Sequence, residues 1–236
     1  MTCCTTVREI IDEAYVLLGD PERERWTVDQ LVGFINEALC EILTYRPDEF
    51  TDVVELTLQP GRLQRLPREY RQFVSLEHNA GDDYPLQEVP EDLLRAFSRK
   101  RCVPRRSACY RVTSWSRNAA NKKTFYVDPP VPDGMNPVVV ATVVLPPPVH
   151  HPDKLDECIG LDCAYRAQIV DWVMMRALEV DQESERQLAM SETYRRKFYT
   201  ALGVDYVQES RFNSGNWLGR TSEGEAAPQT TSAPRS

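Results

Sequence analysis

The chain begins with two stretches whose apolar residues recur at helical spacing. Between residues 5 and 18 they follow the i, i+3, i+4, i+7 rule, which predicts an amphipathic helix that ends at Gly19-Asp20-Pro21. A second helix is predicted to begin at Thr27, whose hydroxyl can form a capping box with Gln30, and to end before Pro47. The two helices are expected to form an antiparallel hairpin.

The middle of the chain replaces the helical period with short alternating runs that predict strands. In DVVELTLQPGRLQRLP, two such runs flank Pro60 and Gly61, which suit the centre of a type II turn, so a β-hairpin is predicted. Pro132-Asp133-Gly134 predicts a further turn, and Pro90 is expected to start a short helix. The remaining predicted strands are Phe73–His78, Tyr110–Trp115, Thr124–Val127 and Val138–Leu145.

Two long helices are predicted towards the end of the chain. The first, from about Asp156 to Leu178, is apolar around much of its circumference and is expected at the centre of the core. The second follows a capping-box pattern at Ser184 and Gln187 and ends at Gly203. The polar residues that follow cannot bury enough apolar surface to order themselves, so a flexible tail is predicted there.

These elements predict an α+β fold in which the two helical hairpins share one bundle. Neither hairpin alone can bury its apolar face, which is why we expect them to pack together. The predicted organisation is an N-terminal helical hairpin at 1–50, an inserted β-rich region of short antiparallel strands at 51–150, a C-terminal helical hairpin at 151–206 and an extended tail at 207–236.

Composition places the chain among soluble globular proteins, with 42% hydrophobic and 27% charged residues. We expect no secretion signal, because the first residues lack a continuous apolar core, and no membrane span, because charged residues interrupt the most apolar run, Ile159–Leu178. The seven cysteines are an odd number without a framework spacing. They are expected to be reduced thiols and not disulfides.

The net charge of −8 is unevenly distributed. Residues 1–60 carry a net charge of −9, residues 61–123 of +7 and residues 124–206 of −6. Within Arg95–Lys123 there are ten basic residues and no acidic one, which suits a surface facing a protein partner or a phosphate backbone, or else a plain solvated loop. The candidate residues for this basic surface are Arg99, Lys100, Arg101, Arg105, Arg106, Arg117, Lys122 and Lys123.

The sequence VVLPPPVHHPDKLDECIG raises the question of a metal site. Zinc requires about four converging ligands, but the adjacent side chains of His150 and His151 tend to point apart. Cys158 and Cys163 are five residues apart on a predicted helix, so they do not share a face. We therefore predict no metal site, and expect both histidines on the surface of a connection between a strand and a helix.

Catalytic patterns are not found elsewhere in the sequence. It contains neither a phosphate-binding glycine loop nor a nucleophile elbow, and Asp82-Asp83 suits a turn between strands. We expect no enzymatic activity and no cofactor. In the tail, Trp217 and Leu218 form either a docking peptide, in which the indole is the anchor, or an incidental apolar pair.

Several stretches, taken in their order, resemble the head-to-tail connector (adaptor) proteins of tailed bacteriophages. They are INEALCEILTYRPDEF, LTLQPGRLQRLPREY, FYVDPPVPDGMNPVVVATVVLPPPV, IGLDCAYRAQIVDWVMMRALEVDQES and AMSETYRRKFYTALG. The resemblance covers most of residues 5–206, but residues 99–109 match no pattern of the family.

The resemblance implies a structural virion protein without catalytic activity. It implies a ring of about twelve copies at the neck of the virion, which bridges the portal protein of the capsid to tail or nozzle proteins and surrounds the DNA exit channel. It also implies assembly in the cytoplasm of the bacterial host, no membrane partner and sequence-independent contact with packaged double-stranded DNA. Terminal extensions in the family reach the portal or a neighbouring subunit, a docking role for which Trp217 and Leu218 are candidates.

Two alternatives stay open. One is a non-catalytic DNA-associated adaptor that uses the basic 95–123 segment without any ring. The other, ranked last, is a small hydrolase, for which no grouping of acid, base and nucleophile can be named.

Overall fold

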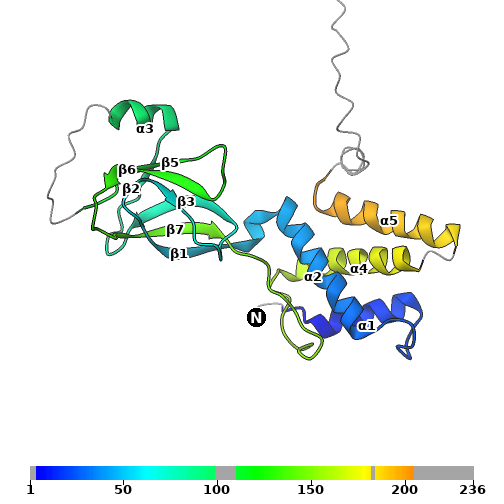
Figure 1. Cartoon of the computed structure of the whole chain (residues 1–236). Helices are drawn as coiled ribbons and strands as arrows, with labels where there is room; N and C mark the ends of the chain where they lie inside the picture. The colour runs from blue at the N-terminus through cyan, green and yellow to red at the C-terminus, as the bar shows by residue number, and fades with distance from the viewer. Residues whose placement is uncertain (1–3, 99–109, 182–183, 205–236) are drawn as a thin grey trace, which may run out of the picture.

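The computed structural model describes residues 4–98, 110–181 and 184–204. In these ranges the chain forms five α-helices and two β-sheets, arranged as a helical body and a β body (Figure 1). The predicted α+β class is therefore confirmed. The tail predicted at 207–236 lies outside the described residues.

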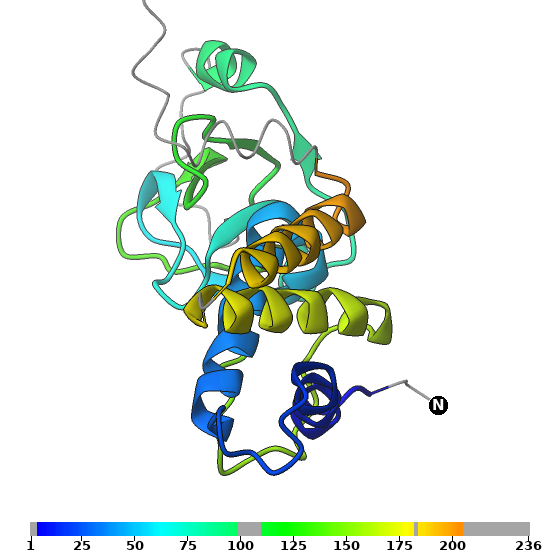
Figure 2. The same ribbon diagram turned by 90° about the vertical axis from the view of Figure 1, so that its right-hand side faces the viewer.

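The helical body begins its first two helices where the sequence supplies a cap. Thr6 with Glu9 and Thr27 with Gln30 each form a complete capping box, the second as predicted. The central helix contacts each of the other three (Figure 2), and apolar side chains from all four helices form one hydrophobic core. The helices of this body are α1 (Val7–Leu18), α2 (Val28–Tyr45), the central α4 (Arg166–Val180) and α5 (Glu185–Ala201).

The β body contains two sheets that share a second hydrophobic core. At its centre the ring of Phe73 stacks on that of Phe125 with centroids 4.1 Å apart, and meets the edge of Trp115 at 5.3 Å. In spatial order the strands are β1 (Thr51–Thr57), β7 (Val138–Val144) and β3 (Gln72–Asn79) in the first sheet, and β2 (Gly61–Arg65), β6 (Thr124–Val131), β5 (Ser114–Arg117) and β4 (Gln87–Glu88) in the second. The short helix α3 (Glu91–Ser98), predicted from Pro90, packs against β5 and β6 of the second sheet.

The hairpin predicted around Pro60 and Gly61 is wrong. β1 pairs with β7 and β2 pairs with β6, so the two runs belong to different sheets. Gly61 has a φ of 106°, which allows a sharp turn, but this turn takes the chain from one sheet to the other. In addition, β4 pairs with β5 in parallel, whereas only antiparallel strands were predicted, and the strand predicted from Tyr110 begins at Ser114.

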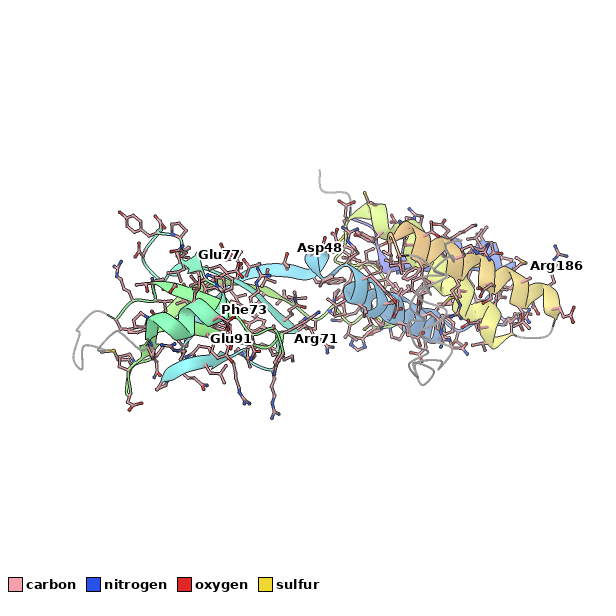
Figure 3. The ribbon with its side chains drawn as sticks, turned by 90° about the horizontal axis from the view of Figure 1, so that it is seen from above. Asp48, Arg71, Phe73, Glu77, Glu91 and Arg186 are labelled. Atoms are coloured by element: carbon pink, nitrogen blue, oxygen red, sulfur yellow. A yellow bond between two sulfur atoms is a disulfide. The ribbon has the colours of Figure 1, made fainter. Side chains whose placement is uncertain are left out.

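The two bodies are joined by a pair of chain segments. The 3-10 helix η1 (Pro47–Phe50) leads from α2 into β1, and the chain returns at the end of β7, where the Leu145 N–H donates to the Phe50 carbonyl at 2.8 Å. Val143 packs into the β core and Val144 into the helical core. Figure 3 shows the bodies end to end, with Asp48 at the junction.

The long helix predicted from Asp156 is wrong over its first part. α4 begins at Arg166, after the 3-10 helix η2 (Cys163–Tyr165). Gly160 has a φ of 76°, which does not fit a right-handed helix, and the Asp162 carboxylate accepts the Ala164 N–H at 2.8 Å in the manner of a cap. Residues 145–162 instead form an irregular linker between the bodies, with turns closed by the hydrogen bonds from Lys154 N–H to His151 O and from Glu157 N–H to Lys154 O.

This linker is joined to the N-terminal segment by a disulfide, which corrects the expectation of reduced thiols. Cys4 and Cys158 are bonded, with their Cα atoms 5.7 Å apart. Backbone hydrogen bonds flank the disulfide: Val7 N–H to Glu157 O (3.1 Å), Arg8 N–H to Leu155 O (2.8 Å) and Ile159 N–H to Thr5 O (3.0 Å). We call the disulfide and these bonds the N-terminal clasp.

His150 was expected at the surface, but its side chain is buried and the residue is only 3% exposed. Its backbone N–H donates to Asn36 Oδ1 at 2.9 Å, and Asn36 Nδ2 donates to its carbonyl at 3.0 Å. Neither ring nitrogen has a hydrogen-bond partner of good geometry among the described residues. Burial lowers the pKa of the imidazole, so the ring is neutral at neutral pH.

Candidate functional site

Exposed cations from two segments lie together on the β body. Arg65, Arg68 and Arg71 come from the end of β2 and the connection to β3, and Lys122 and Lys123 come from the turn between β5 and β6. We call these five residues the basic patch. All five are exposed, and none forms an ion pair with another described residue.

Backbone hydrogen bonds hold the two segments of the basic patch side by side. The Leu66 N–H donates to the Lys123 carbonyl and the Phe73 N–H donates to the Lys122 carbonyl, each at 2.9 Å. Arg65 is paired with Thr124 in the register of β2 and β6. Both lysines are exposed, so their side chains can contact an anionic surface.

Other arginines of the β body are held in intrachain ion pairs. Arg62 pairs with the buried Asp128 carboxylate at 3.1 Å, and Arg111 pairs with Asp82. Arg117 pairs with Glu88 at 3.1 Å, and its guanidinium lies 5.7 Å from the centre of the Trp115 ring. These three side chains stabilise the β body, and Asp82 is engaged in a turn as its sequence context predicts.

The basic patch contains two of the cations predicted from the sequence and three that were not predicted. Lys122 and Lys123 were predicted, and the structure adds Arg65, Arg68 and Arg71. The sequence signal for these three arginines was their spacing of three residues in RLPREYR, which lies within the positively charged segment 61–123. Arg117 was predicted as well, but it forms an ion pair with Glu88 and is not part of the basic patch. Two groups of predicted residues lie outside the described residues: the cations Arg99, Lys100, Arg101, Arg105 and Arg106, and the docking residues Trp217 and Leu218.

A second candidate surface is a groove in the helical body. Its volume is about 490 Å³, and it is lined by α2, α4 and the side of α5 that carries Arg195. Arg176 of α4 pairs with Glu37 of α2 at 2.8 Å and with Glu179 at 3.0 Å, while Arg195 also pairs with Glu179. We call it the interhelical groove.

At the end of this groove, α2 and α5 touch. The Tyr199 hydroxyl donates to the Glu41 carboxylate at 2.7 Å, and the Tyr199 ring meets the Tyr45 ring edge-on at 5.6 Å. Burial together with the Glu41 carboxylate raises the pKa of Tyr199, so this hydroxyl remains a hydrogen-bond donor at neutral pH.

Two surfaces stand out within the described ranges. No three His, Cys, Asp or Glu side chains converge there as metal ligands would. No described helix combines the length and apolar content that a bilayer crossing requires. What the geometry offers is a cationic surface on one body and an apolar, charge-rimmed groove on the other.

Comparison with known proteins decides the family. A family model described as SU10 adaptor protein matches residues 5–219, which span both bodies. The chain belongs to the SU10 adaptor family. This adaptor is therefore a bacteriophage structural protein with a head-to-tail adaptor role, which implies contacts with portal and tail proteins. No curated protein matches the adaptor.

Proposed function

We propose that the adaptor forms a ring of about twelve copies beneath the portal, in the neck of the virion, after assembly in the cytoplasm of the bacterial host. The ring joins the portal of the capsid to the tail and surrounds the DNA exit channel. The observation that carries this proposal is the family match over residues 5–219.

The two-body architecture supports a bridging role. Each body has its own hydrophobic core, and two segments, one before β1 and one after β7, join them end to end (Figures 1 and 3). One body can therefore bind one partner while the other body contacts a second. An arrangement of this kind suits a protein placed between two different assemblies.

The distribution of charge supports lateral contacts between copies. The segments that build the helical body carry most of the acidic excess, whereas residues 61–123 carry a net charge of +7. In a ring, unlike surfaces of adjacent copies meet repeatedly. We assign the basic patch to the acidic helical body of the neighbouring copy.

The alternative partner of the basic patch is packaged DNA. It is favoured by one observation: none of the five cations is neutralised by a described residue. Contact with phosphates predicts retention of duplex DNA at low salt, with a slope of log affinity against log salt that falls by about one for each lysine removed. Salt-insensitive binding or no retention would exclude this second role.

The test is to add purified adaptor to purified portal rings and to measure the mass gained. Twelve copies would add about 325 kDa, twelve times the 27.1 kDa of one chain. An adaptor that is monomeric alone but assembles on the portal agrees with the proposal. An adaptor that adds no mass to the portal ring contradicts it.

Charge reversal tests the assignment of the basic patch. The double variant Lys122→Glu, Lys123→Glu is expected to lose assembly on the portal. The control Arg186→Glu, Arg196→Glu introduces the same charge change at exposed positions of α5, with Arg186 at the far end of the helical body (Figure 3), and is expected to assemble. Equal assembly of both variants would show that the patch lies outside the subunit contact.

A further inference from the structure

The interhelical groove has an apolar floor and an open side. The floor is formed by Trp172 and the buried Met175 of α4, and the Trp172 ring is held against Phe198 with centroids 4.8 Å apart. The volume of about 490 Å³ is in the range of clefts that hold a ligand or a few side chains. The groove is therefore large enough for one bulky aromatic anchor and its neighbours.

The α2 wall of the groove includes two small residues beside Asn36, Glu37 and Glu41. Gly33 and Cys40 are seven residues apart, two turns on the same face of the helix, and both line the groove. A Cβ at Gly33 would meet no atom within 4 Å, so the position opens onto empty space. Glycine inside a helix costs about 1 kcal/mol relative to alanine, and here it leaves the α2 backbone open to solvent.

The groove also has an unbalanced negative charge. Its three carboxylates, Glu37, Glu41 and Glu179, outnumber the guanidinium groups of Arg176 and Arg195. Glu41 accepts its hydrogen bond from the neutral Tyr199 hydroxyl, and no described cation forms an ion pair with it. An occupant with an aromatic anchor and net positive charge fits this groove best.

A segment of the same chain has this composition. Residues 210–221, SRFNSGNWLGRT, contain Trp217, Leu218 and two arginines, Arg211 and Arg220, with no acidic residue. The described part of the chain ends at Val204, nine residues after Arg195 of the groove. The first six of these residues continue α5 to Ala201, which is about 9 Å along the helix axis. Twelve residues separate Val204 from Trp217 and can span about 40 Å, so the groove is within reach.

We propose that the interhelical groove is the docking site for the C-terminal segment of its own chain, with the Trp217 indole and Leu218 placed on Trp172 and Met175. Arg211 and Arg220 lie towards the carboxylates of the rim. The docking concerns a single chain, so it holds whether or not the adaptor forms a ring, and it can be measured in the absence of portal.

The thiol of Cys40 is a natural reporter, because it is free, exposed and part of the groove wall. A short tether gives the segment an effective concentration of about 1 mM. If its Kd for the groove is about 0.1 mM, the state with the groove occupied is about ten times as populated as the state with the groove empty. In the full-length adaptor we therefore expect N-ethylmaleimide to alkylate Cys40 about tenfold faster in the variant Trp217→Ala, Leu218→Ala than in the wild type. Peptide mapping by mass spectrometry separates Cys40 from the other cysteines.

A second variant tests the groove from the opposite side. Gly33→Gln fills the open space next to α2 without a steric clash and favours the helix, so it should displace the segment and speed trypsin cleavage after Arg211 and Arg220. Ala167→Gln, at an exposed position of α4 that does not line the groove, is the matched control and should cleave like the wild type.

The alkylation and cleavage rates together show whether the C-terminal segment docks in the interhelical groove. Faster alkylation in the double variant together with faster cleavage in Gly33→Gln supports the proposal. Unchanged alkylation of Cys40 overturns it, as does a Gly33→Gln variant that cleaves like Ala167→Gln, since the segment would then lie elsewhere. Protection of Cys40 that disappears on dilution overturns the assignment to the same chain, because an intrachain contact does not depend on concentration.

Discussion

The N-terminal clasp gives the sharpest prediction of stability. Replacing Cys4 by serine removes the disulfide to Cys158 but leaves the three flanking backbone hydrogen bonds in place. The two cysteines are 154 positions apart, and the chain between them includes α1, α2 and the whole β body. The bond therefore closes a very long loop in the unfolded chain.

The size of the effect follows from the length of that loop. In the chain-entropy description, a closed loop of about 155 residues stabilises the folded state by about 5 kcal/mol at 25 °C. If the β body stays folded while the helical body unfolds, roughly 60 residues remain flexible, and the same relation gives about 4 kcal/mol. We expect Cys4→Ser to lower the free energy of unfolding by about 4–5 kcal/mol.

The assay is chemical denaturation without reductant, followed by far-UV circular dichroism. Cys40→Ser, which replaces an exposed free thiol, is the matched control and should change the free energy of unfolding by less than about 0.5 kcal/mol. Treating the wild type with dithiothreitol should reproduce the effect of Cys4→Ser. The reasoning is refuted if Cys4→Ser and Cys40→Ser unfold at the same denaturant concentration, or if alkylation finds a free thiol at Cys4 in the oxidised protein.

Three further predictions concern buried polar groups. Burial lowers the pKa of His150, so below about pH 6.5 the unfolded chain binds a proton that the folded chain does not. The free energy of unfolding should therefore fall as the pH drops from about 6.5 towards the pKa of His150 in the folded protein. In thermal melts this pH dependence should be lost in His150→Gln and kept in His151→Gln. Asn36→Leu leaves the His150 backbone N–H and carbonyl without their partner and should cost about 2 kcal/mol in urea denaturation; an unchanged midpoint would contradict the role of this amide. Arg62→Met removes the cation paired with the buried Asp128 carboxylate and should cost about 3 kcal/mol, and a neutral effect would mean that the pair is not required.

Features of the fold with a local signal could be predicted from the sequence. The capping box of Thr27 and Gln30 involves residues three apart, so the start of α2 is visible in the sequence alone. The same is true of the turn at Gly134 and of the start of α3 after Pro90. In each case the decisive contacts lie within one turn of chain.

Features that depend on distant partners were missed. The runs around Pro60 look like a hairpin because alternation reports a strand but not its neighbour, and β1 and β2 find their partners in β7 and β6. The residues from Asp156 onwards were predicted as the start of a helix, although Gly160 and Asp162 were local signs against it. The disulfide and the burial of His150 had no such sign, because their partners, Cys4 and Asn36, lie more than a hundred residues away.

The candidate site likewise contains residues that have a local sequence signal and residues that depend on distant partners. Lys122 and Lys123 were found because basic residues are dense around them in the sequence. Arg65 and Arg71 join them only through the hydrogen bonds that place the β5–β6 turn beside the β2–β3 connection. The interhelical groove combines three helices from both ends of the chain, so the sequence could suggest Trp217 as a docking residue but could not reveal the walls of the groove.

Cryo-electron microscopy of the neck in intact virions shows whether this chain forms the adaptor ring at the head–tail junction. We expect a ring of about twelve copies directly beneath the portal, and both bodies of this chain should fit its density. Virions in which that position is occupied by another protein, or in which this chain is absent, would contradict it.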